Sequence, residues 1–121
     1  NIEEILPRKL VIPKEEGFAY IDLSSVLYAH IHTDKITFTL QNNRVEGYCK
    51  GDIDIEATLQ QKGFIALPNG IMVNSKKVLR VQKGKDGAVL FEGGAELPLD
   101  LSHRDSFIAK LTLINSNKID G

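Results

Sequence analysis

The sequence predicts a mainly β protein: elongated antiparallel sheets built from hairpins, with one central helix and one short C-terminal helix. Short apolar runs recur along the chain, and turns rich in Gly, Asn and Asp separate them, as expected for consecutive β-hairpins. Apolar residues at helical spacing occur in two places only, in the middle of the chain and near its end. Sequential hairpins favour an antiparallel sheet over the α/β layout of nucleotide-binding proteins.

The first part of the chain predicts four strands and one helical turn. Residues 10–12 and 18–21 flank a Gly-containing turn and predict a hairpin. Residues 22–25 offer capping groups for a single helical turn. Residues 26–32 are rich in β-formers, and residues 36–40 alternate strictly between apolar side chains and threonine. That alternation predicts a half-buried strand.

A further strand at residues 45–50 leads into the central helix. The helix is expected to begin at residues 51–52, with Asp52 as its N-cap. Ile55 and Leu59 repeat at i and i+4, and Gly63 is placed where a C-cap glycine ends a helix.

Residues 63–74 carry an apolar, strand-like piece on each side of a corner formed by Pro68, Asn69 and Gly70. Proline fixes φ, while Asn and Gly tolerate positive φ, so the corner has a defined backbone shape. Such a corner can present Asn69 outward on a rigid base. The alternative is that Asn69 serves only to form the turn.

The last part of the chain predicts a hairpin of strands 77–82 and 88–92, joined by a turn that contains Asp-Gly. Residues 95–99 follow as a strand whose Pro98 indicates a sheet edge. Ser102 is expected to cap the C-terminal helix, with an apolar face of Phe107, Ile108 and Leu111.

These elements, about eight short strands and two helices, fit one domain at residues 8–112. Residues 1–7 are expected to be a linker or disordered terminus, and residues 113–121 a polar tail.

The composition excludes some classes of function but does not identify one. The 121 residues are 42% apolar and 26% charged, as in ordinary globular proteins, and the net charge is −1. Any nucleic-acid binding must therefore depend on a local basic face rather than on the global field. The single cysteine, Cys49, excludes an internal disulfide and favours a reducing, cytoplasmic environment.

No sequence pattern indicates catalysis. The phosphate-binding G-x-x-x-x-G-K-[ST], the zinc-protease HExxH and the hydrolase G-x-S-x-G are all missing from the sequence. His30 and His32 could chelate a metal only if folding supplied a third ligand, and two polar-face strand residues explain them more simply. Neither an enzyme, a metal nor a cofactor is expected.

In the order of its motifs the chain resembles a LytTR-type DNA-binding domain, the effector module of many bacterial response regulators. The matching pieces are a Ser-Val-Leu-Tyr strand at residues 25–28, a helix at 51–59, a segment at 64–74 that closes with Val-Asn, and Leu-Pro-Leu-Asp at 97–100. The resemblance covers residues 8–111.

The resemblance implies that loops enter successive major grooves of double-stranded DNA, with side chains on base edges and cations on phosphates. Asn69 would read adenine, and Lys50 would contact a phosphate. The resemblance also implies a homodimer on direct repeats and an upstream receiver or sensor domain of a two-component system. The DNA-binding residues that it implies are Lys35, Lys50, Asn69, Ser102 and Arg104.

The chain departs from the family pattern at six positions, two of which are Leu101 and Ser102, where Arg is usual when the segment is aligned without a gap. Ala66 replaces the usual Arg, Pro68 the usual His and Gly70 the usual Ser, while Asp100 stands in place of Ser. A lost cation removes a phosphate contact, and an added acid repels the backbone. A second hypothesis is therefore a LytTR-like module that has lost strong DNA contact and serves dimerisation or signalling.

A third hypothesis is an unrelated β-rich domain that binds a ligand or a sugar. The first two hypotheses differ in whether five cations share one face: Lys35, Lys50, Lys76, Lys77 and Arg104.

Overall fold

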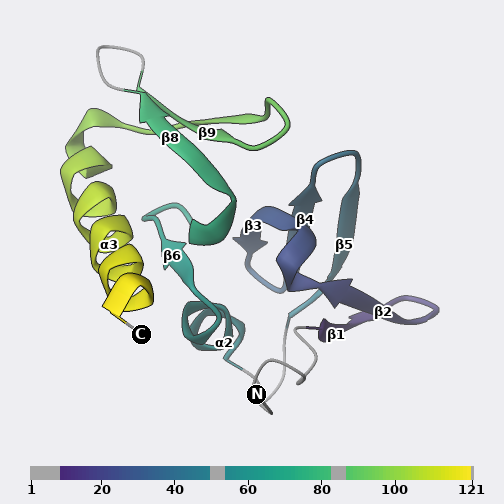
Figure 1. Ribbon diagram of the computed structural model, residues 1–121. Helices are drawn as coiled ribbons and strands as arrows, with labels where there is room; N and C mark the ends of the chain where they lie inside the picture. Colours follow the sequence, from purple (N-terminus) through teal and green to yellow (C-terminus); the bar gives the residue numbers. More distant parts are fainter. Residues whose placement is uncertain (1–8, 50–53, 83–86, 121) are drawn as a thin grey trace.

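The computed structural model describes residues 9–49, 54–82 and 87–120, which form ten strands in three antiparallel sheets and two α-helices (Figure 1). The strands are β1 (Lys9–Lys14), β2 (Gly17–Asp22), β3 (Val26–His32), β4 (Lys35–Leu40), β5 (Arg44–Tyr48), β6 (Phe64–Ala66), β7 (Ile71–Asn74), β8 (Val78–Gln82), β9 (Ala88–Phe91) and β10 (Glu96–Pro98). The helices are α2 (Ile55–Gln61) and α3 (Leu101–Asp120), with short 3₁₀ turns η1 (Leu23–Ser25) and η2 (Ser75–Lys77). The predicted mainly β fold is confirmed. The linker predicted at residues 1–7 lies outside the described residues.

A five-stranded sheet in the order β5-β4-β3-β7-β6 forms the centre of the molecule. Its β3–β4 pair confirms the predicted alternation, because Ile36 and Phe38 are fully buried while Thr37 lies on the opposite face. β1 and β2 form a separate two-stranded sheet, and β10-β9-β8 form a three-stranded sheet. Pro98 belongs to β10, at one edge of that sheet, as predicted.

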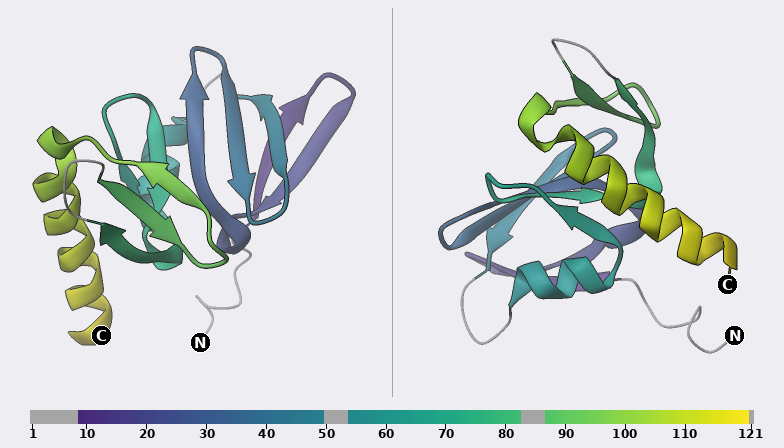
Figure 2. Two further views of the ribbon diagram at one scale, coloured as in Figure 1. Left: turned by 90° about the horizontal axis from the view of Figure 1, so that it is seen from above. Right: turned by 90° about the vertical axis from the view of Figure 1, so that its left-hand side faces the viewer.

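The central sheet carries a hydrophobic core on each face. In β7, Met72 enters the core shared with the β1–β2 hairpin and α2, whereas its neighbour Val73 enters the core shared with β9, β10 and α3. Successive side chains of a strand point to opposite faces, so one short strand serves both cores. Figure 2 shows the arrangement, with α3 and the β8–β9 hairpin on one side and α2 on the other.

The central helix begins two residues later than predicted. Asp54, not Asp52, is its N-cap: the Asp54 Oδ1 accepts a hydrogen bond of 3.1 Å from the Ala57 nitrogen. Asp52 itself lies outside the described residues. Both aspartates have the chemistry of a cap, so the sequence offered no way to choose between them. Gly63 follows the helix with φ +95°, which confirms the predicted glycine at its end.

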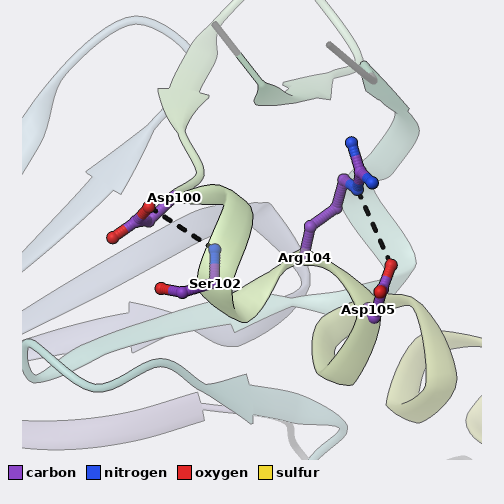
Figure 3. A network of polar contacts seen from close by, with 4 residues as sticks. All are labelled: Asp100, Ser102, Arg104 and Asp105. Carbon is purple, nitrogen blue, oxygen red and sulfur yellow. Dashed lines mark hydrogen bonds and ion pairs between the residues drawn. The ribbon is translucent and has the colours of Figure 1, made fainter. Parts of the chain in front are cut away.

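The C-terminal helix differs from the prediction in its start and its length. α3 runs from Leu101 to Asp120, so the domain boundary predicted at residue 112 falls inside the helix. Ser102 is in the first turn instead of at the cap. Asp100 precedes the helix, and its Oδ1 accepts a long hydrogen bond of 3.5 Å from the Ser102 nitrogen (Figure 3). A carboxylate there complements the positive end of the helix dipole.

Asn74 is a buried polar link at the end of β7. Its Nδ2 donates hydrogen bonds to the carbonyl oxygens of Leu23 (3.2 Å) and Val26 (2.8 Å), and its Oδ1 accepts one from the Lys76 nitrogen (3.1 Å). The side chain is 2% exposed. It thereby joins η1, the start of β3 and η2, which are far apart in the sequence.

Among the described residues, no helix combines the length and the apolar content that crossing a membrane requires.

Candidate nucleic-acid interface

The corner of Pro68, Asn69 and Gly70 is a three-residue hairpin loop between β6 and β7. The Leu67 nitrogen donates to the Ile71 carbonyl oxygen at 2.7 Å and closes the loop. Gly70 takes φ +80°, the left-handed conformation that such loops place at their last position. Pro68 and Asn69 are exposed. The loop therefore holds Asn69 outward on a closed base, as the sequence predicts.

The loop is also fixed to the neighbouring strand. The Ile31 nitrogen donates to the Gly70 carbonyl oxygen at 2.8 Å. A Cβ atom on Gly70 would lie 2.6 Å from the Ile31 carbonyl oxygen, so the close approach of the two backbones requires glycine. The position of Asn69 is thus coupled to β3.

Lys35 is the first residue of β4, directly after the β3–β4 turn, and is exposed. Thr33 in that turn has φ 48°, the one positive φ among the described residues other than glycine. The Asp34 carbonyl oxygen accepts a hydrogen bond of 2.9 Å from the Cys49 nitrogen, which fixes the end of β5 against the turn. Lys35 thus has a defined base, with the acidic Asp34 as its neighbour in the chain.

Strand register brings the β3–β4 turn and the β6–β7 loop to the same end of the central sheet. β3 ends at the turn, and the Ile31 bond to Gly70 places the β6–β7 loop beside that end. Lys35 and Asn69 are 34 positions apart in the sequence, yet both lie at this end of the sheet.

The start of α3 lies on the same side of the molecule. Both views of Figure 2 show the first turn of α3, the β6–β7 loop and the β3–β4 turn in a row along one edge. A groove of about 270 Å³ separates the loop from the helix. Its lining residues are Ala66, Leu67, Pro68, His103, Ser106, Phe107 and Lys110.

The third predicted contact segment is therefore a helix start and not a loop. Ser102 is exposed at the first turn, and His103 faces the β6–β7 loop across the groove. Lys110 was missed as a candidate residue. It follows His103 at i+7, which places both on one face of a helix, and the predicted cap at Ser102 already puts His103 in that helix.

Arg104 is less available than an exposed loop arginine. Its side chain is 25% exposed, and its Nε lies 3.7 Å from the Oδ1 of Asp105, which is 93% exposed (Figure 3). The Nε is buried and has no hydrogen-bond partner among the described residues. A surface ion pair of this kind contributes little to stability, but the carboxylate reduces the positive charge that Arg104 offers to a phosphate.

The five cations do not share one face. Lys35 lies at the end of the central sheet that carries the two loops, whereas Lys76 and Lys77 belong to η2 at the opposite end of β7. Arg104 is in the first turn of α3 and does not line the groove beside the β6–β7 loop. Lys50 lies outside the described residues.

A second hollow, of about 690 Å³, lies between the β1–β2 hairpin and β5 and includes Lys35 in its lining. The Tyr48 hydroxyl donates to the Glu15 Oε1 at 3.3 Å there, and the negative charge of Glu15 raises the pKa of Tyr48. The charged residues of the lining are of both signs: Lys14, Lys35 and Arg44 with Glu15, Glu16 and Glu46. The hollow therefore does not form a basic patch.

Burial raises the pKa of the Cys49 thiol, and the charge of Asp34 adds to this, so the thiol stays protonated near neutral pH.

The rings of His30 and His32 lie with their centroids 3.7 Å apart. Folding places no third ligand beside the two histidines within residues 9–49, 54–82 and 87–120.

The described residues thus form a mainly β domain in which two loops and the start of a helix lie along one edge. One solved structure similar to this chain is the LytTr DNA-binding domain of a protein from Bacillus cereus, described as a methyl-accepting/DNA response regulator. The TM-score is 0.64 at 17% sequence identity, and the alignment covers 85% of this chain and 95% of that domain. No family model matches the sequence, and no curated protein is significantly similar to it. The likeness in structure establishes the LytTR-like fold.

Proposed function

We propose that this domain binds double-stranded DNA sequence-specifically and regulates transcription, as the effector module of a bacterial two-component response regulator in the cytoplasm. One observation carries the proposal. The resemblance marks three segments as DNA contacts: the β3–β4 turn, the β6–β7 loop and the start of α3. They are distant in sequence, yet they lie in a row along one edge of the molecule (Figure 2). The DNA-binding function of the similar Bacillus cereus domain supports it.

In this proposal the end of the central sheet that carries the β3–β4 turn and the β6–β7 loop faces the DNA. The β6–β7 loop inserts into a major groove, and the amide of Asn69 binds adenine bidentately, accepting from N6 and donating to N7. The β3–β4 turn and the start of α3 flank that loop on either side. They contact the duplex next to it, in successive major grooves.

The cations of the interface bind phosphates. Lys35, Lys50 and Arg104 would neutralise three phosphates, so the logarithm of the binding constant should fall against the logarithm of salt concentration with a slope of about −3. This slope is shallow for a DNA-binding protein and agrees with a net charge of −1. Binding as a homodimer on direct repeats, next to a receiver or sensor domain, would add affinity through a second site.

The second candidate is a LytTR-like module that has lost strong DNA contact and serves dimerisation or signalling. The charge distribution favours it: Lys76 and Lys77 lie away from the candidate interface, and Asp105 accompanies Arg104. Ala66 and Pro68, which replace a cation and a histidine of the family pattern, line the groove next to Asn69.

The two candidates are separated by direct binding measurements. A duplex is selected from a random-sequence library with the immobilised domain, and its binding is then followed by fluorescence anisotropy at low and at physiological salt. DNA binding predicts a selected sequence that is bound more tightly than a scrambled duplex of equal length. No enrichment, together with no binding at micromolar protein in low salt, would exclude the first candidate. Sedimentation equilibrium of the same sample tests self-association without DNA.

A further inference from the structure

His30 and His32 form a pair at the end of β3 that leads into the β3–β4 turn. They are two residues apart on one strand and therefore point to the same side of the sheet. Their ring centroids lie 3.7 Å apart, with the ring planes tilted by 45°. His32 is exposed and His30 partly exposed, so both rings are accessible.

The pair lies between the two loops of the candidate interface. His32 ends β3 just before the turn and pairs across the strands with Lys35. On the other side, His30 pairs with Ile71, and its Cδ2 would lie 3.8 Å from a Cβ on Gly70. The imidazoles thus fill the sheet surface between the Lys35 turn and the Asn69 loop.

The charged neighbours of the pair are few. His30 lies opposite Thr37 on β4, and Thr37 lies opposite Glu46 on β5. His32 lies opposite Lys35 on β4, and Lys35 lies opposite Tyr48 on β5. On β7 the neighbour is Ile71. Asp34 lies in the adjacent turn. The Glu46 carboxylate is exposed and accepts a hydrogen bond from the Thr37 hydroxyl at 3.4 Å.

We propose that His30 and His32 are a further DNA-contacting element: their imidazolium groups bind a backbone phosphate between the two loops, so that DNA binding takes up protons. This inference rests on the proposed function. Histidine is the side chain whose ordinary titration falls between pH 5 and 8. A phosphate bound between the two rings interacts favourably with their protonated, positively charged forms. DNA binding therefore favours the protonated pair, and affinity rises as the pH falls.

The small number of histidines in the chain allows a pH dependence of DNA binding to be assigned to particular residues. The chain has three histidines, and the third, His103, lines the groove at the start of α3. The raised pKa of Cys49 keeps the thiol out of the same pH range. Three proteins are compared with the wild type: His30→Gln, the double variant His30→Gln/His32→Gln, and His103→Gln, which removes the third histidine of the chain. Glutamine keeps hydrogen-bonding groups and removes the titration. Circular dichroism and thermal unfolding establish that each variant is folded.

Affinity for the selected duplex is measured at constant salt from about pH 6 to about pH 8, across the range of histidine titration. The wild type should bind at least about fivefold more tightly at the acidic end than at the basic end, and the double variant should show less than about a twofold difference. An equal pH dependence in the double variant and the wild type overturns the inference but leaves the proposed function standing. Pronounced pH dependence that is lost only in His103→Gln also overturns it. Absence of binding by the wild type at every pH overturns both.

Discussion

The main-chain nitrogen of Ile31 donates a hydrogen bond of 2.8 Å to the carbonyl oxygen of Gly70, and this bond places the β6–β7 loop beside the end of β3. Gly70 adopts φ +80° and has no room for a side chain on the Ile31 side. Asn69 next to it therefore has a rigid base. The hydrogen bond between Ile31 and Gly70 therefore connects the fold to the candidate DNA interface.

Gly70→Ala should destabilise the domain by about 1–3 kcal/mol, because alanine is strained at positive φ and its Cβ would clash with the Ile31 carbonyl oxygen. Gly94→Ala is the matched control, since Gly94 has a similar φ of +97° but no atom within 4 Å of its virtual Cβ. The free energy of unfolding is measured in urea. The cost at Gly70 should exceed that at Gly94; equal costs would show that the contact with Ile31 adds nothing.

Asn74→Ala should lower the free energy of unfolding by about 2–3 kcal/mol, because buried hydrogen-bonding partners lose their bonds. The affected groups are the carbonyl oxygens of Leu23 and Val26 and the nitrogen of Lys76. Asn42→Ala, at an exposed position, serves as the control and should change stability little. A comparable small effect at Asn74 would contradict its role as a link between η1, β3 and η2.

Phe107→Ala should destabilise the domain by about 3–5 kcal/mol, as expected for removing a buried aromatic side chain. Phe107 is 1% exposed and attaches α3 to the core on the second face of the sheet. Leu113, 62% exposed on the same helix, provides the comparison. Thermal unfolding of both alanine variants tests whether α3 is docked through this face; similar melting temperatures would indicate that it is not.

Cys49 should react slowly with iodoacetamide near pH 8. Burial and the charge of Asp34 raise the pKa of its thiol, so less thiolate is present than in a free cysteine at the same pH. The rate should rise with pH through the raised pKa, and unfolding in urea should bring it to that of a model thiol. A rate in the native protein equal to the model thiol would contradict the assigned environment.

Local elements were predictable from the sequence because their signals are local. The alternation at residues 36–40, the glycine at Gly63 and the edge position of Pro98 each follow from neighbouring residues, and the structure confirms them. Choices between equivalent groups were not predictable: Asp54 caps α2 where Asp52 was expected, and Asp100 precedes α3 where Ser102 was expected.

Relations across the sheet needed the structure. That Lys35 and Asn69 lie at one end of it, and Lys76 at the other, depends on strand register and not on any local pattern. The predicted C-terminal helix already contained Arg104 and Asp105, but the distance between their charged groups came only from the structure.

The central claim is that the β6–β7 loop reads DNA sequence through Asn69. Asn69→Ala removes the amide while keeping the closed loop, so binding to the selected duplex should weaken about tenfold, with binding to a scrambled duplex nearly unchanged. Lys50→Ala and Lys35→Ala serve as controls. Each should weaken both duplexes alike and make the salt slope shallower by about 1.

The most direct measurement is therefore the ratio of the dissociation constants of the scrambled and the selected duplex, determined by anisotropy for the wild type, Asn69→Ala and Lys50→Ala. The proposed function predicts that this ratio falls about tenfold for Asn69→Ala and stays near the wild-type value for Lys50→Ala. An unchanged ratio in Asn69→Ala, or equal losses on both duplexes, would contradict it.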